Sequence, residues 1–463
     1  MNAEKIKLYG KRALSLFLFA AGIVVICRLL EYPLVDDTAS QSRVTFHDYY
    51  ETEPIDILFV GPSHSVHFID GVELTDQLGV SVFNLSTKGQ HIEETYSLIK
   101  DAVENRGIKR ICCELSITRL KNMDIDQTAV YIVTDYFKNP IENAKMIFGL
   151  TPTAAYLNAL PLRRGIDPLK FTASEPFEII KKKQDPAYSG YEGTEMYRGR
   201  GEWAIYDINY DADGYAYNVN TTTINHFTTK SMNQVRLDYL RKIIRVCREN
   251  DAQLIFYIPP FSEVYKQAFE EYWQITDLTK QLVAEEGATL IDLNLVKDEY
   301  LHLDASDFYE MDHANTQAGE RISDFLAQYI REPDGDYFLD TLEEKYPDQD
   351  AVTAVAFSAE FQTDKGTYNK VKDIKGKLKE IKLQIWAQGY HPIKAQGRIW
   401  STTYDEETGS HVENKELTGT VIDEYKTVFT IPGEDFGEDF LIRLYDPDTG
   451  EQIYRAYSAF DKD

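Results

Sequence analysis

The chain has 463 residues, enough for two or three domains, and its 43% hydrophobic and 27% charged residues are typical of globular proteins rather than disordered ones. The net charge of -27 argues against nucleic acid as a partner, because such a surface repels phosphates. Four cysteines are present: Cys27, Cys112, Cys113 and Cys247. Their spacing matches neither a disulfide framework nor a zinc site, so we expect no metal and no cofactor.

The N-terminus predicts a membrane anchor over residues 13–30, because the run 13–27 carries no charge. Four basic residues precede it: Lys5, Lys7, Lys11 and Arg12. They keep residues 1–12 in the cytoplasm and place the main domains outside, and the Arg28 side chain can reach the interface. A cleaved signal peptide is the alternative, although no typical cleavage site follows. We expect a single-pass protein of the cell membrane, and the absence of disulfide spacing fits a Gram-positive-type surface.

Residues 31–54 are polar and mixed, and we interpret them as a spacer. Beyond them, short apolar runs predict buried strands at 55–60, 80–85, 110–117, 253–258 and 289–293. Helical spacing of apolar residues predicts helices at 91–105, 231–250, 262–286 and 316–330. This alternation predicts an α/β fold, a doubly wound parallel sheet in three layers similar to flavodoxin, over residues 55–331.

Three further segments interrupt or follow this domain. Residues 118–229 are rich in Tyr, Asn, Gly and Asp and are too long for a loop, so we interpret them as an insertion that forms a lid or a substrate-binding surface. Residues 332–350 are charged and predict a linker. Alternating runs separated by turn signals predict an all-β sandwich, an accessory domain over 351–463.

The segment that follows the first predicted strand suggests a nucleophile. Ser63 follows a Gly-Pro pair at the carboxyl end of this strand, where doubly wound folds bind ligands. A helix N-cap is the alternative role of such a serine. His313 precedes the last predicted helix, with Glu310 and Asp312 beside it. A serine hydroxyl needs a base, and the base needs a carboxylate, which either acid could supply.

These segments resemble the SGNH/GDSL hydrolase superfamily over about residues 55–331, with the insertion excluded. Residues 61–63 take the place of its Gly-Asp-Ser motif, and 310–313 correspond to Asp-x-x-His. The segment 83–89 resembles the second block, whose glycine donates a backbone N–H to the oxyanion. The resemblance therefore implies oxyanion donors at the backbones of Ser63 and Gly89.

The third block departs from the family. Its Gly-x-Asn-Asp motif supplies a side-chain amide to the oxyanion, whereas here residues 114–119 hold no asparagine. Arg119, Ser116 or Thr118 could substitute, or this donor is missing. Losing one such donor costs on the order of 100-fold or more in rate. The departure leaves both an active enzyme and a degenerate one open.

Other polar side chains near the predicted strand ends are candidates for the pocket lining: His64, Ser65, His67, Asn84 and Asn315. Structural roles for these residues are the alternative. His64, His67 and Asp70 are not spaced in a way that predicts a metal site.

A membrane-anchored chain with a diverged third block resembles the DltD- and AlgX-like groups of the superfamily. The segment 312–315, followed by Gly319, is similar to that set. The resemblance implies a serine esterase or O-acyltransferase acting on acetyl or D-alanyl esters of cell-surface polysaccharide or teichoic acid, beside a membrane-bound O-acyltransferase. The alternative is a catalytically degenerate surface module that binds polysaccharide or scaffolds such a complex. The residues leave hydrolysis and transfer equally open.

Overall fold

The computed structural model describes residues 3–459 apart from short gaps. Those in the insertion are 122–124, 166–174, 185–195, 205–218 and 221–227. The others are 39, 268, 270, 305–306, 311, 349–350, 353, 369–373, 389–391, 406–409, 418, 422–425 and 434–438. The insertion predicted over 118–229 therefore lies partly outside the described residues.

Five parallel strands form the central sheet in the order β2-β1-β3-β7-β8. Their bounds are β1 (Ile57–Val60), β2 (Val82–Asn84), β3 (Arg110–Glu114), β7 (Gln253–Ile258) and β8 (Thr289–Asp292). The predicted parallel α/β sheet is confirmed. Leu115 and Ile117 are buried outside β3, which explains why the apolar run predicted a longer strand. The strand order places the switch point of the sheet between β1 and β3.

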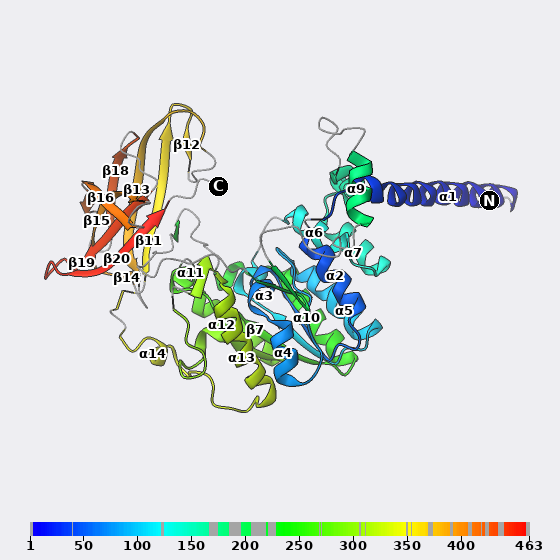
Figure 1. The fold of residues 1–463 in the computed structure, drawn as a ribbon, viewed down its shortest axis with the longest axis horizontal. Coiled ribbons are helices and arrows are strands. Elements are labelled where there is room, and N and C mark those ends of the chain that lie inside the picture. The colour runs from blue at the N-terminus through cyan, green and yellow to red at the C-terminus, as the bar shows by residue number, and fades with distance from the viewer. Residues whose placement is uncertain are drawn as a thin grey trace.

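Helices cover both faces of this sheet (Figure 1). One group is α5 (Ile92–Asn105), α10 (Gln234–Glu249) and α12 (Tyr272–Glu285). The other is α3 (Ser63–Phe68), α4 (Gly71–Leu78) and α13 (Thr316–Arg331). The helix predicted over 262–286 is divided into α11 (Glu263–Gln267) and α12. In α13 the predicted apolar face, including Ile322 and Phe325, is buried.

The interpretation of 31–54 as a spacer is wrong for its second half, which forms α2 (Gln41–Glu51). Its Phe46 and Tyr49 side chains are buried in the core of the α/β domain, and the Tyr49 ring lies 5.5 Å from the Phe83 ring of β2. Arg106 donates hydrogen bonds to the carbonyl oxygens of Tyr49 and Thr52, both 2.7 Å long. The helix belongs to the folded domain because its apolar side chains need this core.

The segment predicted as a linker, 332–350, also packs against the α/β domain. Tyr337 and Tyr346 are buried, and the Tyr346 hydroxyl donates a 2.8 Å hydrogen bond to Glu263 of α11. A short helix, α14 (Leu342–Lys345), lies in this segment. The buried tyrosines hold the connection close to the domain although its charged residues suggested a free linker.

The C-terminal region is β-rich, as predicted, and consists of two antiparallel sheets that share one hydrophobic core. The first contains β11 (Ala354–Thr363), β12 (Thr367–Tyr368), β13 (Leu378–Gln388), β14 (Pro392–Ile393), β17 (Gly419–Val421) and β18 (Lys426–Pro432). The second contains β15 (Gln396–Asp405), β16 (Ser410–Leu417), β19 (Asp439–Tyr445) and β20 (Gln452–Ala459). One short strand of the insertion, β6 (Val219–Asn220), pairs with β11.

The described part of the insertion is mostly helical. It contains α6 (Gln127–Thr134), α7 (Pro140–Leu150), η2 (Thr153–Ala159), α8 (Pro161–Gly165), α9 (Glu175–Gln184) and the hairpin of β4 (Met196–Gly199) and β5 (Glu202–Ala204). The hairpin packs against α3, whereas α8 and α9 pack against the N-terminal helix α1 (Ala3–Leu34). Figure 1 shows α1 extending away from the rest of the chain. Its segment Lys11–Leu34 is long and apolar enough to span a membrane or to act as a signal.

Gly319 provides a test of how α13 is seated on α3. A Cβ atom at this position would lie 2.9 Å from the His67 carbonyl oxygen and from Phe68 Cα, both backbone atoms that cannot move freely. We expect Gly319→Ala to lower the free energy of unfolding by about 1–3 kcal/mol, measured by the thermal midpoint. Gly149→Ala in α7 meets open space and serves as the control. Equal midpoints for both variants would contradict this packing.

Candidate active site

The turn after β1 brings Ser63 to the switch point of the sheet. Gly61 is required here, because a Cβ atom would lie 2.7 Å from both Glu114 Cβ and Ser65 Oγ. Pro62 ends the extended backbone, and α3 begins at Ser63, which is half-buried. The hydroxyl therefore lies at the carboxyl edge of the strands, where a ligand can reach it.

His313 reaches Ser63 from the short hairpin of β9 (Phe308–Glu310) and β10 (His313–Ala314). Its Nε2 lies 2.8 Å from Ser63 Oγ, and its Nδ1 lies 2.9 Å from Asp312 Oδ1. In the matching tautomer, the Nδ1–H donates to Asp312 and Nε2 accepts the serine proton. Ser63, His313 and Asp312 thus have the geometry of a catalytic triad.

The structure describes the side chain of one of the two carboxylates that the sequence left open. Asp312 contacts His313 directly. Glu310 ends β9 and pairs with His313 through the backbone, and its side chain lies outside the described residues. Among the described side chains, Asp312 therefore has the position to orient the imidazole.

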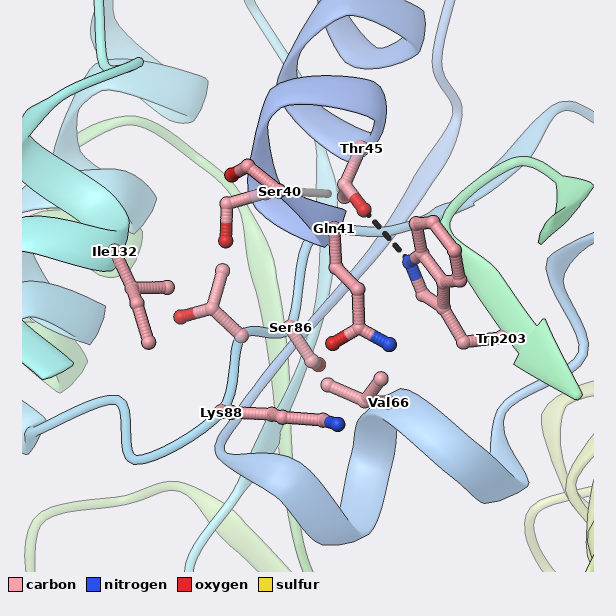
Figure 2. Close-up of a pocket in the computed structure, with 10 residues that line it drawn as sticks. Ser40, Gln41, Thr45, Val66, Ser86, Lys88, Ile132 and Trp203 are labelled. Atoms are coloured by element: carbon pink, nitrogen blue, oxygen red, sulfur yellow. Dashed lines mark hydrogen bonds between the residues drawn. The ribbon is translucent and has the colours of Figure 1, made fainter. Parts of the chain in front are cut away.

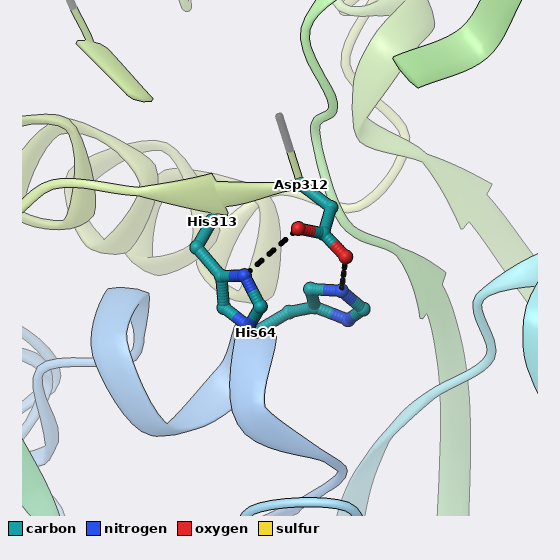
Figure 3. A group of neighbouring side chains, drawn as sticks. All are labelled: His64, Asp312 and His313. Carbon is teal, nitrogen blue, oxygen red and sulfur yellow. Dashed lines mark hydrogen bonds and ion pairs between the residues drawn. The ribbon is translucent and has the colours of Figure 1, made fainter. Parts of the chain in front are cut away.

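Asp312 also contacts a second histidine, as Figure 3 shows. Its Oδ2 lies 3.3 Å from His64 Nε2, and His64 Nδ1 lies 2.9 Å from Glu114 Oε1 at the end of β3. Glu114 is fully buried, and His64 is nearly so. His64 therefore bridges two carboxylates behind the triad.

The hydrogen-bonded chain continues beyond Glu114 into the core. Ser65 Oγ donates a 2.6 Å hydrogen bond to Glu114 Oε2 and accepts one of 2.6 Å from the Tyr257 hydroxyl of β7. Sequence interpretation missed Glu114 and Tyr257. Glu114 could have been found in the sequence, because it is an acid at the end of an otherwise apolar strand. A carboxylate buried there requires a hydrogen-bond partner.

The charges in this cluster can be assigned from its contacts. Burial favours neutral His64, but Glu114 and Asp312 raise the pKa of its imidazole to about 10. Burial also opposes ionisation of Asp312, yet hydrogen bonds from His313 and His64 hold its pKa well below the usual range. The pKa of Glu114 is lowered as well, because the attraction of His64 outweighs burial. At neutral pH one imidazolium therefore lies between two carboxylates.

Residues 85–90, which include Gly89 and are called the oxyanion loop below, lie beside the turn that carries Ser63, called the nucleophile turn. The backbone N–H of Thr87 donates to the Gly61 carbonyl oxygen at 3.1 Å, which ties residues 85–90 to the exit of β1. Gly89 has a φ of +68°, and a Cβ atom there would lie 2.8 Å from Ala129 Cβ. Both the conformation and the close contact require glycine.

The Arg119 guanidinium of the third block donates from Nη2 to Thr95 Oγ1 of α5 at 2.5 Å. Its Nε and Nη1 are buried without a hydrogen-bond partner among the described residues, so the oxyanion-donor role of Arg119 stays a prediction. Ser116 Oγ and Thr118 Oγ1 lie 3.3 Å from each other. The end of β3 contributes the Glu114 carboxylate to the site.

The remaining pocket candidates have structural contacts. Asn84 is buried and its amide donates to the carbonyl oxygens of Ser65 and Ile69, and Asn315 caps α13. His67 Nδ1 donates to the Trp203 carbonyl oxygen at 3.2 Å, and burial lowers its pKa to about 3. Its neutral ring lies 6.1 Å from the His313 ring. The rings of His64 and His67 thus both lie next to the His313 imidazole.

His64, Asp312 and His313 hold ligand-type atoms within 4.8 Å of one another, as a metal site requires (Figure 3). Each ring nitrogen of the two histidines already has a hydrogen-bond partner in Ser63, Asp312 or Glu114. A cation would have to break these hydrogen bonds. The geometry fits proton transfer better than metal binding.

A cavity of about 190 Å³ lies between the start of α2, which contributes Gln41 and Thr45, and Val66 of α3 (Figure 2). Its walls come from Val66 of α3, from Ser86, Thr87 and Lys88 of the oxyanion loop, and from the Trp203 indole. The Ser86 hydroxyl is buried without a hydrogen-bond partner among the described residues. The cavity is small and has both polar and apolar walls, which suits a short group that carries both kinds of surface.

No protein-family model matches this chain, and no curated protein matches it in sequence. Solved structures do match. A GDSL-like lipase from Bacteroides thetaiotaomicron is 8% identical, with 64% of this chain and 99% of that chain covered and a TM-score of 0.29. A lipase/acylhydrolase from Enterococcus faecalis is 12% identical, covering 60% and 97%, with a TM-score of 0.27.

A psychrotrophic esterase from Pseudoalteromonas is likewise 12% identical, covering 60% of this chain and 97% of that chain, with a TM-score of 0.27. The three proteins are described as lipases or esterases. At these TM-scores the similarity is coarse, so the functional interpretation of the site depends on its own geometry.

Proposed function

We propose that this chain is an SGNH/GDSL-type serine esterase or O-acyltransferase, anchored outside the cell membrane, that acts on acetyl or D-alanyl esters of cell-surface polysaccharide or teichoic acid. The observation that carries the proposal is the 2.8 Å hydrogen bond between Ser63 Oγ and His313 Nε2, with Asp312 behind it. A serine activated in this way attacks acyl carbonyl groups.

The triad supports a two-step acyl transfer. Ser63 Oγ bonds to the acyl carbon while its proton moves to His313 Nε2, and the carbonyl oxygen becomes an oxyanion. The C–O bond to the leaving alcohol then breaks as His313 returns the proton to that oxygen. Water or a polymer hydroxyl next attacks the acyl-Ser63 ester with His313 as base. Water gives a free acid, and a hydroxyl gives a new ester.

The oxyanion and the acyl group have neighbouring sites. The backbone N–H groups of Ser63 and Gly89 are the proposed oxyanion donors, since Gly89 lies on a loop tied to the nucleophile turn. We assign the acyl group to the small cavity lined by Val66 of α3 and by residues 86–88, whose size supports a short group such as acetyl or D-alanyl. A long fatty acyl chain would need a larger and more apolar cavity.

The proposed location follows from α1. This helix is apolar enough to span a membrane, and basic Lys11 and Arg12 precede its apolar run. Positive residues on the N-terminal side favour a cytoplasmic N-terminus, which places the triad outside. A membrane-bound O-acyltransferase is the proposed partner, since such an enzyme could deliver the acyl group at the same membrane.

His64 has a positioning role in the proposed reaction. Its bond to Asp312 Oδ2 fixes the carboxylate whose other oxygen orients His313. Because the charges of His64 and Glu114 offset each other, Asp312 keeps its full negative charge to stabilise the imidazolium that forms on His313.

A non-catalytic surface module is the second candidate, and one observation favours it: the third block directs Arg119 to α5 and supplies no side-chain amide. Such a module would bind polysaccharide or scaffold an acyltransferase complex. The intact contacts of Ser63 and His313 favour the enzyme.

Labelling of the serine separates these two candidates. We expect the full chain in detergent to react with a fluorophosphonate and to hydrolyse an acetyl ester, because His313 removes the Ser63 proton. Ser63→Ala should abolish labelling, and His313→Ala should lower turnover by on the order of 10⁴-fold or more. Ser401→Ala in β15 is the control. A folded wild type that neither labels nor turns over any ester, yet binds polymer, would favour the non-catalytic module.

A second comparison identifies the acid of the triad. Asp312→Asn should reduce kcat by on the order of 10⁴-fold, because it stabilises the wrong tautomer of His313. Glu310→Gln should leave kcat within a few-fold of the wild type. Steady-state kinetics on the same acetyl ester measures both. The opposite ranking would assign the role to Glu310.

The charge of His64 predicts a pH dependence of stability. The pKa of about 10 in the folded state exceeds the ordinary value of 6.5, so His64 contributes its full stabilisation below about pH 6.5 and loses it as pH rises to 10. The double variant His64→Gln/Glu114→Gln removes the buried cation and one carboxylate together. Thermal midpoints from pH 6 to 10 should fall more steeply in the wild type. Parallel curves would contradict a protonated His64.

A further inference from the structure

The end of α1 is fixed to the insertion by several contacts. Lys183 of α9 donates a 2.7 Å hydrogen bond to the Val35 carbonyl oxygen, and Lys182 forms a 3.0 Å ion pair with Asp36. The Lys183 ammonium also lies 5.4 Å from the centre of the Tyr32 ring. Figure 1 shows α9 against this end of α1. Helix α9 therefore lies beside the last turns of α1, at the same height along the α1 axis.

The length of α1 places this height at the membrane surface. Its uncharged run, residues 13–27, extends only about 22 Å at the helical rise, less than the roughly 30 Å of a hydrocarbon core. A spanning helix must therefore use residues after Cys27 as well. Leu29, Leu30 and Tyr32 remain exposed there. The segment beside α9 consequently lies in or next to the lipid.

Exposed apolar side chains are concentrated on the insertion helices near the end of α1. The described residues after α1 hold eight exposed large apolar side chains, and four of them lie on α7, η2 and α9. These four are Ile141, Phe148, Leu157 and Phe177, each more than 60% exposed. Contacts are continuous from α7 through η2 and α8 to α1. Half of the exposed large apolar side chains described after α1 thus lie on helices that contact α1 directly or through one another.

The outer face of α7 has the pattern of an interfacial helix. Ile141, Lys145 and Phe148 are spaced four and three residues apart, which places them on one face, and all three are exposed. Met146 and Leu150 on the other face are buried. Aromatic, aliphatic and lysine side chains together are typical of helices that lie in the membrane interface.

Basic residues accompany these apolar ones although the whole chain has a net charge of -27. The exposed basic residues on the same helices are Lys145, Arg163, Arg164, Lys181 and Lys182. Three of them form ion pairs with acids of the chain: Lys145 with Glu142, Arg164 with Asp135 and Lys182 with Asp36. Two acids, Glu175 and Glu178, lie in the first turn of α9, away from its basic last turn. Clustered lysines and arginines beside apolar side chains favour anionic lipid headgroups.

We propose that residues 140–165 and 175–184, here called the collar, rest on the outer leaflet of the lipid bilayer around α1. Phe148, Leu157 and Phe177 enter the headgroup region, and the neighbouring basic side chains contact lipid phosphates. This inference depends on the proposed anchor role of α1 and is independent of the chemistry at Ser63. The collar holds the catalytic domain in one orientation toward the membrane. Part of the segment predicted as a lid thus contacts lipid.

Environment-sensitive probes on the full chain test the collar. In a Cys27→Ala background the other three cysteines are buried, so single cysteines at Phe148, Leu157 and Phe177 can be labelled with a nitrobenzoxadiazole dye. The matched controls are Val421→Cys and Ile453→Cys in the C-terminal region, which are also exposed apolar positions. The protein is placed in nanodiscs of phosphatidylcholine with a minor share of phosphatidylglycerol.

We expect the three collar probes to emit at shorter wavelength than the controls and to be quenched several-fold more by lipids with a nitroxide near the headgroup. Water-like emission and equal quenching at all positions, with α1 retained by intact mass, would overturn the collar alone. Loss of α1 from the membrane-bound protein would overturn the anchor and the collar together. Fluorophosphonate labelling of Ser63 reports separately on the proposed chemistry.

Discussion

The carboxylate of Asp312 is shared between two imidazoles, and the candidate active site is arranged around this shared group. One oxygen orients His313 toward Ser63, and the other binds His64. A carboxylate held at both oxygens cannot rotate away from the catalytic histidine. The cost of burying it is offset because His64 carries a positive charge and Glu114 satisfies the far side of that ring. Removing His64 would leave the buried Glu114 carboxylate without the imidazolium that it binds.

The parallel sheet makes this arrangement possible. β1 and β3 are neighbours in register, with Val60 opposite Cys113, so the residues that follow both strands meet at one edge. Ser63 and His64 come from the first strand end, and Glu114 comes from the second. The carboxylate at the end of β3 binds His64 and so supports Asp312. In the proposed reaction, backbone N–H groups stabilise the oxyanion.

The insertion contacts two other parts of the chain, α3 of the α/β domain and the last turns of α1. Its hairpin packs on α3, where Trp203 accepts the hydrogen bond of His67 and lines the small cavity. Its helices pack on the last turns of α1, where Lys183 binds Val35. Under the proposed collar, one segment both shapes the acyl pocket and holds that pocket at a constant distance from the lipid. A surface enzyme that receives acyl groups at the membrane would need this constraint.

The amino-acid sequence by itself determined the strands and helices of the α/β domain, the β-rich C-terminal region and the placement of Ser63 and His313 at element ends, because apolar periodicity and turn residues act locally. It did not predict α2, because this helix is mostly polar in sequence although one of its faces is buried. Tertiary structure alone selected Asp312 as the contact of His313 and joined His64 to Glu114, fifty residues apart. Distances between such segments depend on strand register and helix packing, which no local pattern encodes.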